Sequence, residues 1–301
     1  MPSAWAERLV GRVTGRVAED EPLGPLTTFR VGGAADVFVE AETTSDLAAV
    51  GELAAEGVAV AIVGRGSNLL VADAGFRGIA VKLGRGFRTH EETDDGLRLG
   101  GAVYLPAAAK LTARLGLTGF EFAAEIPATF GGAVRMNAGA HDACMADVLS
   151  TATVFDVASG IERTVATADL DYAYRHSSLG AHDIVTGGEI NLGPADPRAV
   201  GARIREYLEW RRTHQPPGRS AGSVFVNPPG DAAGRLIEEA GAKGMRIGGA
   251  EVSPVHANFI VASPDATASD VWQLITRVRD LVEERCGVAL RPEVRFLGDF
   301  S

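Results

Sequence analysis

The stretch that decides the fold is Val58–Asn68, with the sequence VAVAIVGRGSN. Its first six residues are a continuous apolar run, which is typical of a strand buried on both faces of a sheet. The glycines that follow, Gly64 and Gly66, allow positive φ, so that backbone N–H groups can converge on an anion such as a pyrophosphate. Arg65, Ser67 and Asn68 add a cation and two short polar groups. Taken alone, the loop favours a tight turn that binds nothing over a phosphate site.

Two familiar phosphate-binding motifs are excluded at this loop. A Rossmann fingerprint needs a further glycine pair that opens a helix, and a P-loop ends in Gly-Lys-Ser or Gly-Lys-Thr. Neither feature follows Asn68.

Strand and helix patterns alternate on both sides of the loop and predict an α+β protein. The boundary stretch Gly193–Pro197 has two prolines and a glycine, which favours a division into ranges 1–83, 84–195 and 196–301. The predicted strands are Asp36–Ala41, Ile79–Leu83, Leu97–Val103, Ala152–Val157, Ile161–Val165, Ile184–Leu192, Ser223–Asn227 and a strand within Val252–Ala262. One predicted helix runs from a cap at Ser45 or Asp46 to Glu56. The other predicted helices are Pro106–Gly116, Arg198–Arg212, Ala232–Ala240 and Ser269–Arg285.

Composition excludes several classes of protein. The 301 residues are 46% hydrophobic and 23% charged, with a formal net charge of -10. Nucleic-acid binding is not expected, because it requires clustered cations. No membrane partner is expected, since no apolar run approaches the roughly 20 residues that a span requires. The first eight residues predict no signal peptide, which favours the cytoplasm. Cys144 and Cys286 have no metal-ligand spacing, so reduced thiols and no metal site are expected.

A second glycine-rich stretch, Ile126–Gly139, could bind a flat ring system. Small residues let a ring lie close to the backbone, and Asn137 could hydrogen-bond to its polar edge. A glycine-rich crossover between strands is an equal alternative. The small residues of this candidate site are Gly131, Gly132, Ala133 and Gly139.

Three further residues could carry chemistry. Ser223 follows a small-residue bend, but Phe225 stands where the Gly-x-Ser-x-Gly elbow of hydrolases has glycine. A nucleophilic serine would also need a His and Asp pair, and no histidine here has a telling spacing. Arg175 and Glu293 are individually unremarkable.

Taken together and in order, these segments resemble the UDP-N-acetylenolpyruvoylglucosamine reductase family, also called UDP-N-acetylmuramate dehydrogenase or MurB. The resemblance covers nearly the whole chain, although no single motif is decisive. The matching segments are Leu26–Gly33, Val63–Leu70, Ile126–Gly139, Tyr174–Ser177, Gln215–Pro216, Ala221–Pro228, Ala233–Glu238, Lys243–Ala250, Val252–Ser253, His256–Phe259 and Pro292–Gly298.

The resemblance implies a two-subdomain FAD-binding fold of the vanillyl-alcohol-oxidase (PCMH) type, followed by a C-terminal α+β substrate-binding domain. It implies that NADPH reduces FAD, which reduces the enolpyruvyl ether of a UDP-sugar in peptidoglycan precursor synthesis, and so serves cell-wall biogenesis, cell shape and cell division. Ser223 would donate the proton, Arg175 would hold the substrate carboxylate, and Glu293 would polarise or protonate the intermediate. Gly64–Asn68 and Ile126–Gly139 would bind the cofactor. The implied substrate-binding residues are Tyr174, His214, Gln215 and Asn227.

The sequence also departs from the family. Glu125 and Ala128 stand where many members have glycine, and Val226 replaces a common lysine. No histidine lies in Gly64–Asn68, so non-covalent FAD is expected, and the short connection between Asn191 and Arg198 predicts the compact subtype. A monomer is also expected. The alternatives are a flavin oxidoreductase of the same fold with another substrate, or a non-catalytic flavin-binding protein.

Overall fold

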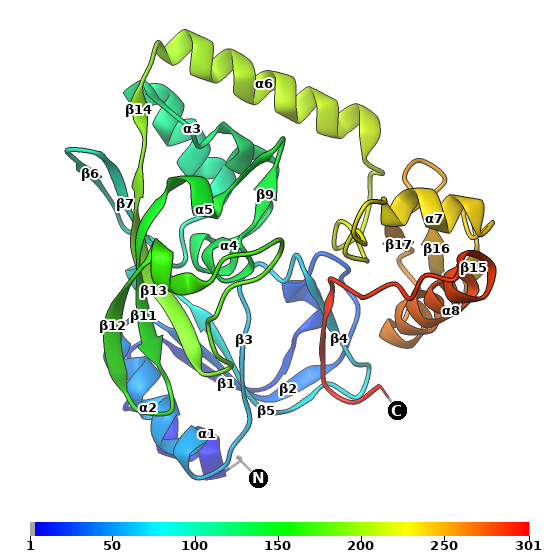
Figure 1. The fold of residues 1–301 in the computed structure, drawn as a ribbon. Coiled ribbons are helices and arrows are strands. Elements are labelled where there is room, and N and C mark those ends of the chain that lie inside the picture. Colours follow the sequence, from blue (N-terminus) through cyan, green and yellow to red (C-terminus); the bar gives the residue numbers. More distant parts are fainter. Residues whose placement is uncertain (1–3, 301) are drawn as a thin grey trace. The chain divides into compact units, whose positions relative to one another are not determined.

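The computed structural model describes residues 4–300, whose elements are labelled in Figure 1. These residues form two compact units. Residues 4–19, 37–64 and 78–211 belong to unit 1, and residues 20–36, 65–77 and 212–300 belong to unit 2. The three-way division at residues 83 and 195 stays a prediction. The glycine loop is divided between the units, because Gly64 belongs to unit 1 and Arg65–Asn68 to unit 2.

A four-stranded sheet has the order β1-β2-β5-β3. The predicted strands Asp36–Ala41 and Ile79–Leu83 are confirmed within it. The expectation that Val58–Val63 is buried on both faces is wrong. Its strand lies at the sheet edge and pairs only with β5, so that Ile62 is 37% exposed. The strands are β1 (Arg16–Pro22), β2 (Ala34–Ala41), β3 (Val60–Ile62) and β5 (Phe76–Leu83).

Helices α1 (Ala4–Leu9) and α2 (Thr44–Ala55) share one core with this sheet. The predicted cap at Ser45 or Asp46 is wrong. Thr43 is the cap: its side chain accepts the N–H of Asp46 at 3.2 Å, and the Asp46 carboxylate accepts the N–H of Thr43 at 3.3 Å. Asp46 is therefore the third helical residue of a capping box, which satisfies two N–H groups at the helix start.

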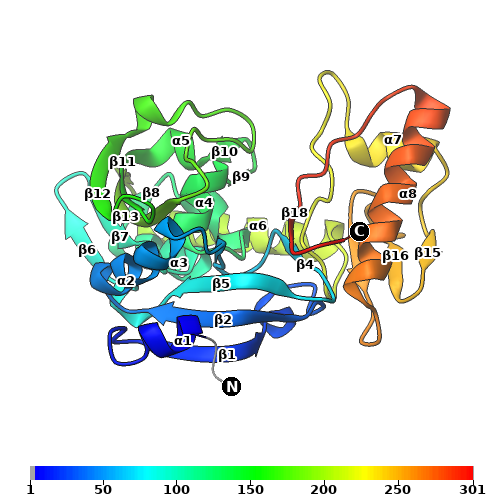
Figure 2. The ribbon, with the colours of Figure 1, turned by 90° about the horizontal axis from the view of Figure 1, so that it is seen from below.

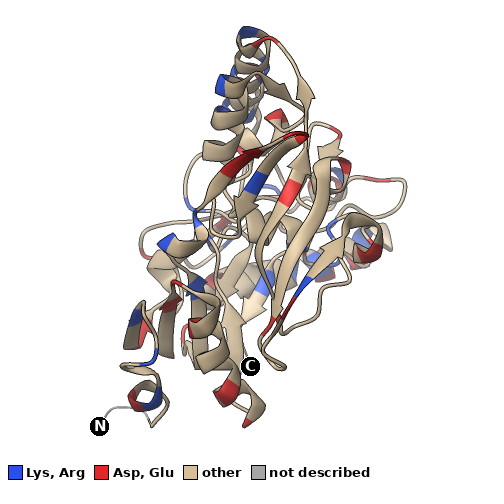
Figure 3. Ribbon diagram, turned by 90° about the vertical axis from the view of Figure 1, so that its left-hand side faces the viewer, with Lys and Arg blue, Asp and Glu red and all other residues tan. Residues whose placement is uncertain are grey.

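The second sheet has the order β12-β11-β13-β7-β6, with every neighbouring pair antiparallel. It confirms the predicted strands in residues 97–192. Arg98 on β7 bridges Glu91 on β6 at 2.7 Å and Glu189 on β13 at 2.6 Å, and basic and acidic positions are interspersed on these strands in Figure 3. The strands are β6 (His90–Thr93), β7 (Gly96–Gly100), β11 (Leu149–Asp156), β12 (Ile161–Ala166) and β13 (Asp183–Asn191).

Four helices accompany this sheet in the sequence of unit 1. The predicted helix Pro106–Gly116 is confirmed, and Gly116 ends it in the left-handed conformation with φ 69°. The glycine-rich stretch contains a helix that the sequence analysis did not predict, begun by the side chain of Thr129. The helices are α3 (Leu105–Leu115), α4 (Phe130–Met136), α5 (Met145–Val148) and α6 (Pro197–His214), of which α6 extends three residues into the range of unit 2.

Unit 2 is built around α8 (Ala268–Cys286), whose apolar stripe is buried against the three-stranded sheet β15-β16-β17 and helix α7 (Ala233–Glu239). Figure 2 shows α8 beside this sheet. The predicted role of the stripe in core packing is confirmed. The predicted stretch Ser223–Asn227 forms isolated bridges rather than a strand. The strands are β15 (Arg246–Ile247), β16 (Ala250–Val252) and β17 (Ile260–Ala262).

Three short pairings complete the fold. In unit 2, β4 (Leu69–Val71) and β18 (Arg295–Leu297) pair in parallel, and Figure 1 shows these distant parts of the sequence side by side. The remaining elements are the pairs β8 (Leu117–Thr118) with β14 (Gly193–Pro194) and β9 (Gly139–Ala140) with β10 (Ala143–Cys144), and the 3-10 turns Gly24–Leu26, Arg85–Phe87, Glu121–Glu125 and Thr167–Leu170.

Candidate active site

Ser223 lies in an extended segment that unit 2 holds on both sides. On one side, Ser223 forms an antiparallel bridge with Phe259, and the N–H of Val224 donates to the carbonyl oxygen of Asn258 at 2.8 Å. On the other side, the N–H of Glu293 donates to the carbonyl oxygen of Val224 at 2.7 Å. The structure thus brings the predicted proton donor and the predicted glutamate onto adjacent, hydrogen-bonded segments.

Asn68, the last residue of the glycine loop, is bonded to the same glutamate. Its side-chain amide donates to the carbonyl oxygen of Glu293 at 3.1 Å, and its own carbonyl accepts the N–H of Arg295 at 3.0 Å. The side-chain oxygen Oε2 of Glu293 is shielded from solvent. A predicted cofactor residue and a predicted catalytic residue are therefore parts of one hydrogen-bonded structure.

The glycine loop has the properties of a phosphate cradle. Gly66 has φ 58°, and a Cβ atom there would lie 2.6 Å from the carbonyl oxygen of Leu26 and from Cα of Thr27. Its carbonyl accepts the N–H of Thr28 at 3.1 Å, which fixes the turn. Among the hydrogen bonds of residues 4–300, none has the N–H of Gly66 or Ser67 as donor. Such backbone N–H groups can bind anionic oxygens, so the loop fits the pyrophosphate of a dinucleotide.

Three of the four predicted cofactor glycines in unit 1 differ in what surrounds them. A Cβ on Gly64 or Gly132 would meet only the side chain of Thr129, at 3.0 Å and 3.3 Å. A Cβ on the buried Gly131 would lie 2.6 Å from the carbonyl oxygen of Val185, on β13. Gly131 therefore permits close packing of α4 on the sheet, whereas Gly132 leaves its backbone exposed.

The Asn137 side chain is buried and is used within the protein. Its amide nitrogen donates to the carbonyl oxygen of Ala173 at 3.1 Å, and its oxygen accepts the N–H of Ala146 at 2.9 Å. Asn137 thereby ties the segment before Arg175 to the end of α4. The predicted contact of this side chain with flavin stays a prediction. Of the other residues predicted in this segment, Ala133 is fully buried and Ile126 packs at the edge of the same core.

Arg175 is held in the left-handed conformation, with φ 56°. Its guanidinium donates to the carbonyl oxygen of Gly139 at 3.0 Å. On either side of it, the Tyr172 hydroxyl donates to the carbonyl oxygen of Val134 at 2.8 Å and the Ser177 hydroxyl to that of Arg135 at 2.6 Å. These bonds fix the loop that carries the predicted carboxylate-binding arginine.

Burial raises the pKa of the Tyr172 phenol, and the nearby Cys144 raises it further. Desolvation disfavours the phenolate. Tyr172 therefore remains a hydrogen-bond donor to the α4 backbone at every pH at which the protein is handled.

Backbone strain is concentrated near Arg175. Of the seven described non-glycine residues with positive φ, five lie between positions 137 and 175. This conformation costs about 1–2 kcal/mol per residue and persists where surrounding contacts enforce it, often at functional sites. The five residues are Asn137, His141, Asp142, Asp171 and Arg175.

The predicted substrate-binding residues have varied settings. The ring of Tyr174 is 54% exposed, and its centroid lies 5.0 Å from the guanidinium carbon of Arg175. His214 is exposed at the last position of α6, and Gln215 next to it is half-buried. Asn227 is exposed, and its side-chain oxygen accepts the N–H of Ala233 at the start of α7 at 3.0 Å. Substrate contact by these residues stays a prediction.

Asn258 is a site residue to which the sequence analysis assigned no role. Its side chain accepts the N–H of Phe225 at 2.9 Å and donates to the carbonyl oxygen of Phe225 at 2.8 Å, although it is only 3% exposed. It thus acts as an extra backbone partner for the segment that starts at Ser223. The sequence did hold a signal for this role, because an amide side chain stands in the largely apolar run Ala257–Val261. A buried amide requires hydrogen-bond partners.

Other expectations concern metals, thiols and membranes. Within residues 4–300, no three His, Cys, Asp or Glu side chains are grouped so that they could hold a metal ion. Cys144 and Cys286 are free thiols. None of the helices in the described part of the chain is both long and apolar enough to cross a membrane.

Family models match both parts of the chain. The model of the UDP-N-acetylenolpyruvoylglucosamine reductase C-terminal domain matches residues 213–297, and an FAD binding domain matches residues 35–165. The chain is 45% identical over 291 residues to UDP-N-acetylenolpyruvoylglucosamine reductase of Heliobacterium modesticaldum, with 95% of this chain and 92% of the relative covered. It is 45% identical over 301 residues to UDP-N-acetylenolpyruvoylglucosamine reductase 2 of Symbiobacterium thermophilum, with 98% and 97% covered.

Solved structures agree with these matches. The UDP-N-acetylenolpyruvylglucosamine reductase of Thermus caldophilus superposes with a TM-score of 0.81 at 35% identity, covering 94% of this chain and 99% of that one. A BBE-like protein of Physcomitrella patens has a TM-score of 0.59 at 12% identity, covering 94% and 89%. The latter likeness concerns the fold alone, and together they confirm the predicted FAD-binding fold with a C-terminal α+β domain.

Proposed function

Because the chain belongs to the UDP-N-acetylenolpyruvoylglucosamine reductase family, whose members use FAD and NADPH, we propose that it reduces UDP-N-acetylglucosamine-enolpyruvate to UDP-N-acetylmuramate. When bound, FAD would supply the redox chemistry that links NADPH to the enolpyruvyl double bond. A proton then completes the saturated product. The protein must supply that proton, hold the carboxylate and position the cofactor.

We assign the proton to the hydroxyl of Ser223. A serine hydroxyl is a weak acid, but the carbon left after hydride addition is a strong base. Arg175 binds the substrate carboxylate, where negative charge accumulates, because a guanidinium can pair with both of its oxygens. Glu293 polarises or protonates the same intermediate.

The observation that carries this assignment is the hydrogen bond from the N–H of Glu293 to the carbonyl oxygen of Val224, 2.7 Å long. Glu293 thus lies beside Val224, the residue that follows Ser223, although 69 positions separate Glu293 from Val224 in sequence. Two groups suited to proton transfer thus have fixed positions in unit 2. The proposal places FAD on Gly64–Asn68 and Ile126–Gly139.

The proposal is tested by NADPH oxidation with and without UDP-N-acetylglucosamine-enolpyruvate. Wild type is expected to oxidise NADPH in a substrate-dependent way, and Ser223→Ala to lose about a thousandfold or more of kcat, in the range of a positioned acid–base group. The absence of substrate-dependent oxidation in wild type would overturn the proposed reaction. An unimpaired Ser223→Ala enzyme would refute only the role of Ser223.

We further propose that FAD is bound without a covalent link, since Gly64–Asn68 holds no histidine. Acid precipitation should release yellow flavin into the supernatant, and colour kept in the pellet would refute the proposal. A monomeric state, a cytoplasmic location and a contribution to cell shape and division remain predictions. Size-exclusion chromatography with light scattering tests the first of these.

A further inference from the structure

Glu125 directly precedes the segment 126–139, His141 follows it after Ala140, and the two are joined through their side chains. Nε2 of His141 contacts Oε1 of Glu125 within hydrogen-bonding distance. The Glu125 side chain is 4% exposed and that of His141 is 19% exposed. A buried carboxylate needs a polar or charged partner, and His141 provides one.

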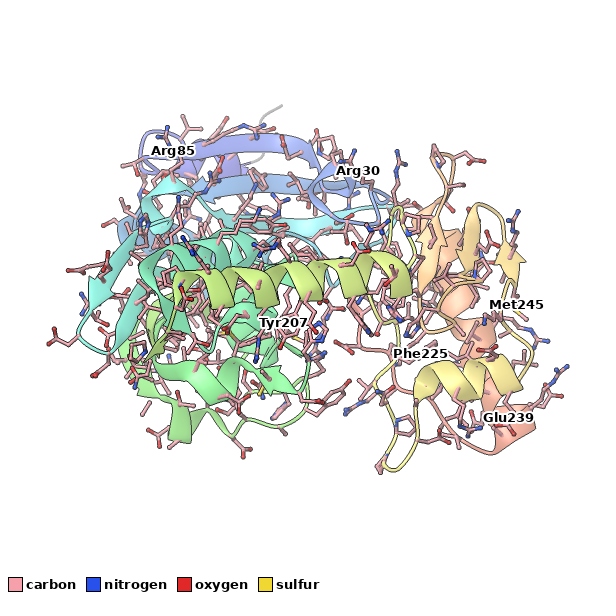
Figure 4. The ribbon with its side chains drawn as sticks, turned by 90° about the horizontal axis from the view of Figure 1, so that it is seen from above. Arg30, Arg85, Tyr207, Phe225, Glu239 and Met245 are labelled. Atoms are coloured by element: carbon pink, nitrogen blue, oxygen red, sulfur yellow. The ribbon has the colours of Figure 1, made fainter. Side chains whose placement is uncertain are left out.

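Helix α6 covers this pair. The ring of Tyr207 stacks on His141, with centroids 3.8 Å apart and planes inclined by 5°, and Trp210 meets His141 edge-on at 5.2 Å. The guanidinium of Arg211 donates to the carbonyl oxygen of Glu125. Figure 4 shows Tyr207 on α6. Three residues of the last two turns of α6 therefore hold the pair in place. We call Glu125, His141 and Tyr207 the clasp.

The backbone at His141 has the left-handed conformation of a tight turn. His141 and Asp142 are the two central residues of the β9–β10 hairpin and have φ 52° and 60°. A two-residue turn with positive φ at both positions strongly favours Asn-Gly or Asp-Gly, so His-Asp is a strained choice. The contacts of the imidazole with Glu125 and Tyr207 offset that strain.

We propose that the clasp is a positioning device for FAD: it closes the segment 126–139 into a fixed loop and so sets the affinity for the cofactor. Its members are positioning residues and need not touch the flavin. The inference rests on the proposed role of Ile126–Gly139 in FAD binding. The link depends on the Glu125 side chain, because a glycine at this position could not form it and would leave the segment less restrained.

The test measures FAD affinity in the flavin-free full-length protein, by fluorescence quenching and without substrate. Glu125→Ala and His141→Asn should each raise the FAD Kd about tenfold, equivalent to about 1.4 kcal/mol. Asparagine tolerates the left-handed conformation of the turn but is too short to reach Glu125. The double variant should resemble the weaker-binding single variant within about twofold, because both changes remove one link.

Matched variants separate positioning from folding. Asp142→Asn changes an exposed charge in the same turn and should leave the Kd unchanged. Glu125→Gln keeps an acceptor for His141, and Tyr207→Phe keeps the stacked ring, so both should bind FAD within about threefold of wild type. The thermal midpoint of each flavin-free variant reports folding. If Glu125→Ala does not fold, His141→Asn and Tyr207→Ala carry the test.

The results have distinct meanings. An FAD Kd within twofold of wild type in folded Glu125→Ala and His141→Asn would overturn the clasp. A rise in substrate KM with unchanged FAD affinity would also overturn it, since that pattern indicates direct substrate contact. Failure of the proposed reaction would appear separately, as wild-type protein that binds FAD but shows no substrate-dependent oxidation of NADPH.

Discussion

The side-chain amide of Asn68 donates a hydrogen bond to the backbone carbonyl of Glu293, 3.1 Å away, across 225 positions of sequence. Next to it, Arg295 donates from its N–H to the Asn68 carbonyl at 3.0 Å and begins the parallel pairing of β18 with β4. The loop predicted to hold a phosphate and the glutamate predicted to act in catalysis are therefore mechanically linked.

Asn68→Ala should weaken catalysis through this link. The carbonyl of Glu293 would lose a hydrogen bond worth about 1 kcal/mol, and the backbone that carries the carboxylate would loosen. We expect kcat at saturating FAD to fall about fivefold or more, with a small decrease in thermal stability. Steady-state kinetics at increasing FAD concentrations make the measurement. Full recovery of kcat by added FAD would show that Asn68 serves cofactor binding alone.

Asn258→Ala should disturb the segment that carries Ser223. It leaves the N–H and carbonyl of the buried Phe225 without their side-chain partners, at a cost of about 2–4 kcal/mol. Chemical denaturation should detect this loss, and kcat should fall more than KM changes. Gln273→Ala is the control, because Gln273 is exposed and its side-chain amide donates to the Ser269 hydroxyl within α8, away from the segment of Ser223. Equal effects of the two changes on kcat would contradict the special role of Asn258.

Gly131→Ala and Gly132→Ala should differ in their effects on thermal stability and on FAD binding. A Cβ at Gly131 would lie 2.6 Å from the carbonyl oxygen of Val185 and force α4 from the sheet, with overpacking costing about 1–3 kcal/mol. A Cβ at Gly132 meets only the flexible Thr129 side chain. We expect the first change to lower the melting temperature, and the second to preserve it while weakening FAD binding. A stable Gly131→Ala protein would contradict the packing role.

Asp46 should make the stability of unit 1 depend on acid pH. Burial of the carboxylate acts to raise its pKa, but bonds from the N–H groups of Thr14 and Glu42 and from the Thr14 hydroxyl outweigh burial, so the pKa is lowered. A lowered carboxyl pKa stabilises the fold above the unfolded value, near 4, and this stabilisation is lost as pH falls through the folded pKa.

Asp46→Asn should therefore be less stable than wild type at pH 7 by about 1–3 kcal/mol, and the difference should narrow below pH 4. Urea denaturation of both proteins between pH 7 and pH 3 provides the comparison. Asp36→Asn serves as the control. The Asp36 carboxylate pairs with the exposed guanidinium of Arg77 at 2.5 Å. A stability difference that stays constant with pH would refute the charge-dependent role.

His256 should add a second pH dependence of the same sign, at a higher pH than that of Asp46. Burial is the main cause that lowers the pKa of its imidazole, and Lys243 contributes. Near pH 6.5 the imidazole binds a proton in the unfolded chain but not in the folded protein. The free energy of unfolding should therefore decrease as pH falls below that value, until the folded imidazole is also protonated. Nuclear magnetic resonance titration of the imidazole measures the pKa directly, and a value above 6.5 would contradict this account.

Local patterns predicted most helices and strands because each depends on neighbours in the sequence. The stripe of Val271, Leu274 and Val278 predicted a buried face of α8, and Gly116 predicted the end of α3. The helix at Phe130–Met136 escaped prediction because Gly131 and Gly132 disfavour helices locally, while close packing on β13 requires Gly131. The burial of Val58–Val63 was misjudged because edge position depends on strand order.

The same distinction applies to the site. The residue types of Ser223, Arg175 and Glu293 and their ordered motifs were sufficient to indicate a flavin reductase. Three features could be seen only in the tertiary structure. They are the hydrogen bond of Asn68 to Glu293, the hydrogen bonds of Asn258 to the backbone of Phe225, and the contact of Glu125 with His141. No periodic pattern in the sequence indicates that the two residues of each contact meet.

By itself, the sequence determined the family, the α+β class and the glycine loop, because short-range geometry and ordered motifs are written along the chain. Only the tertiary structure decided which groups support the chemistry. The Glu293 carboxylate owes its place to Val224 and Asn68, and the segment 126–139 is closed by Glu125 and His141. The physical reason is that hydrogen bonds and ring contacts act over a few ångströms in space, and the packing of the chain decides which distant residues come within that range.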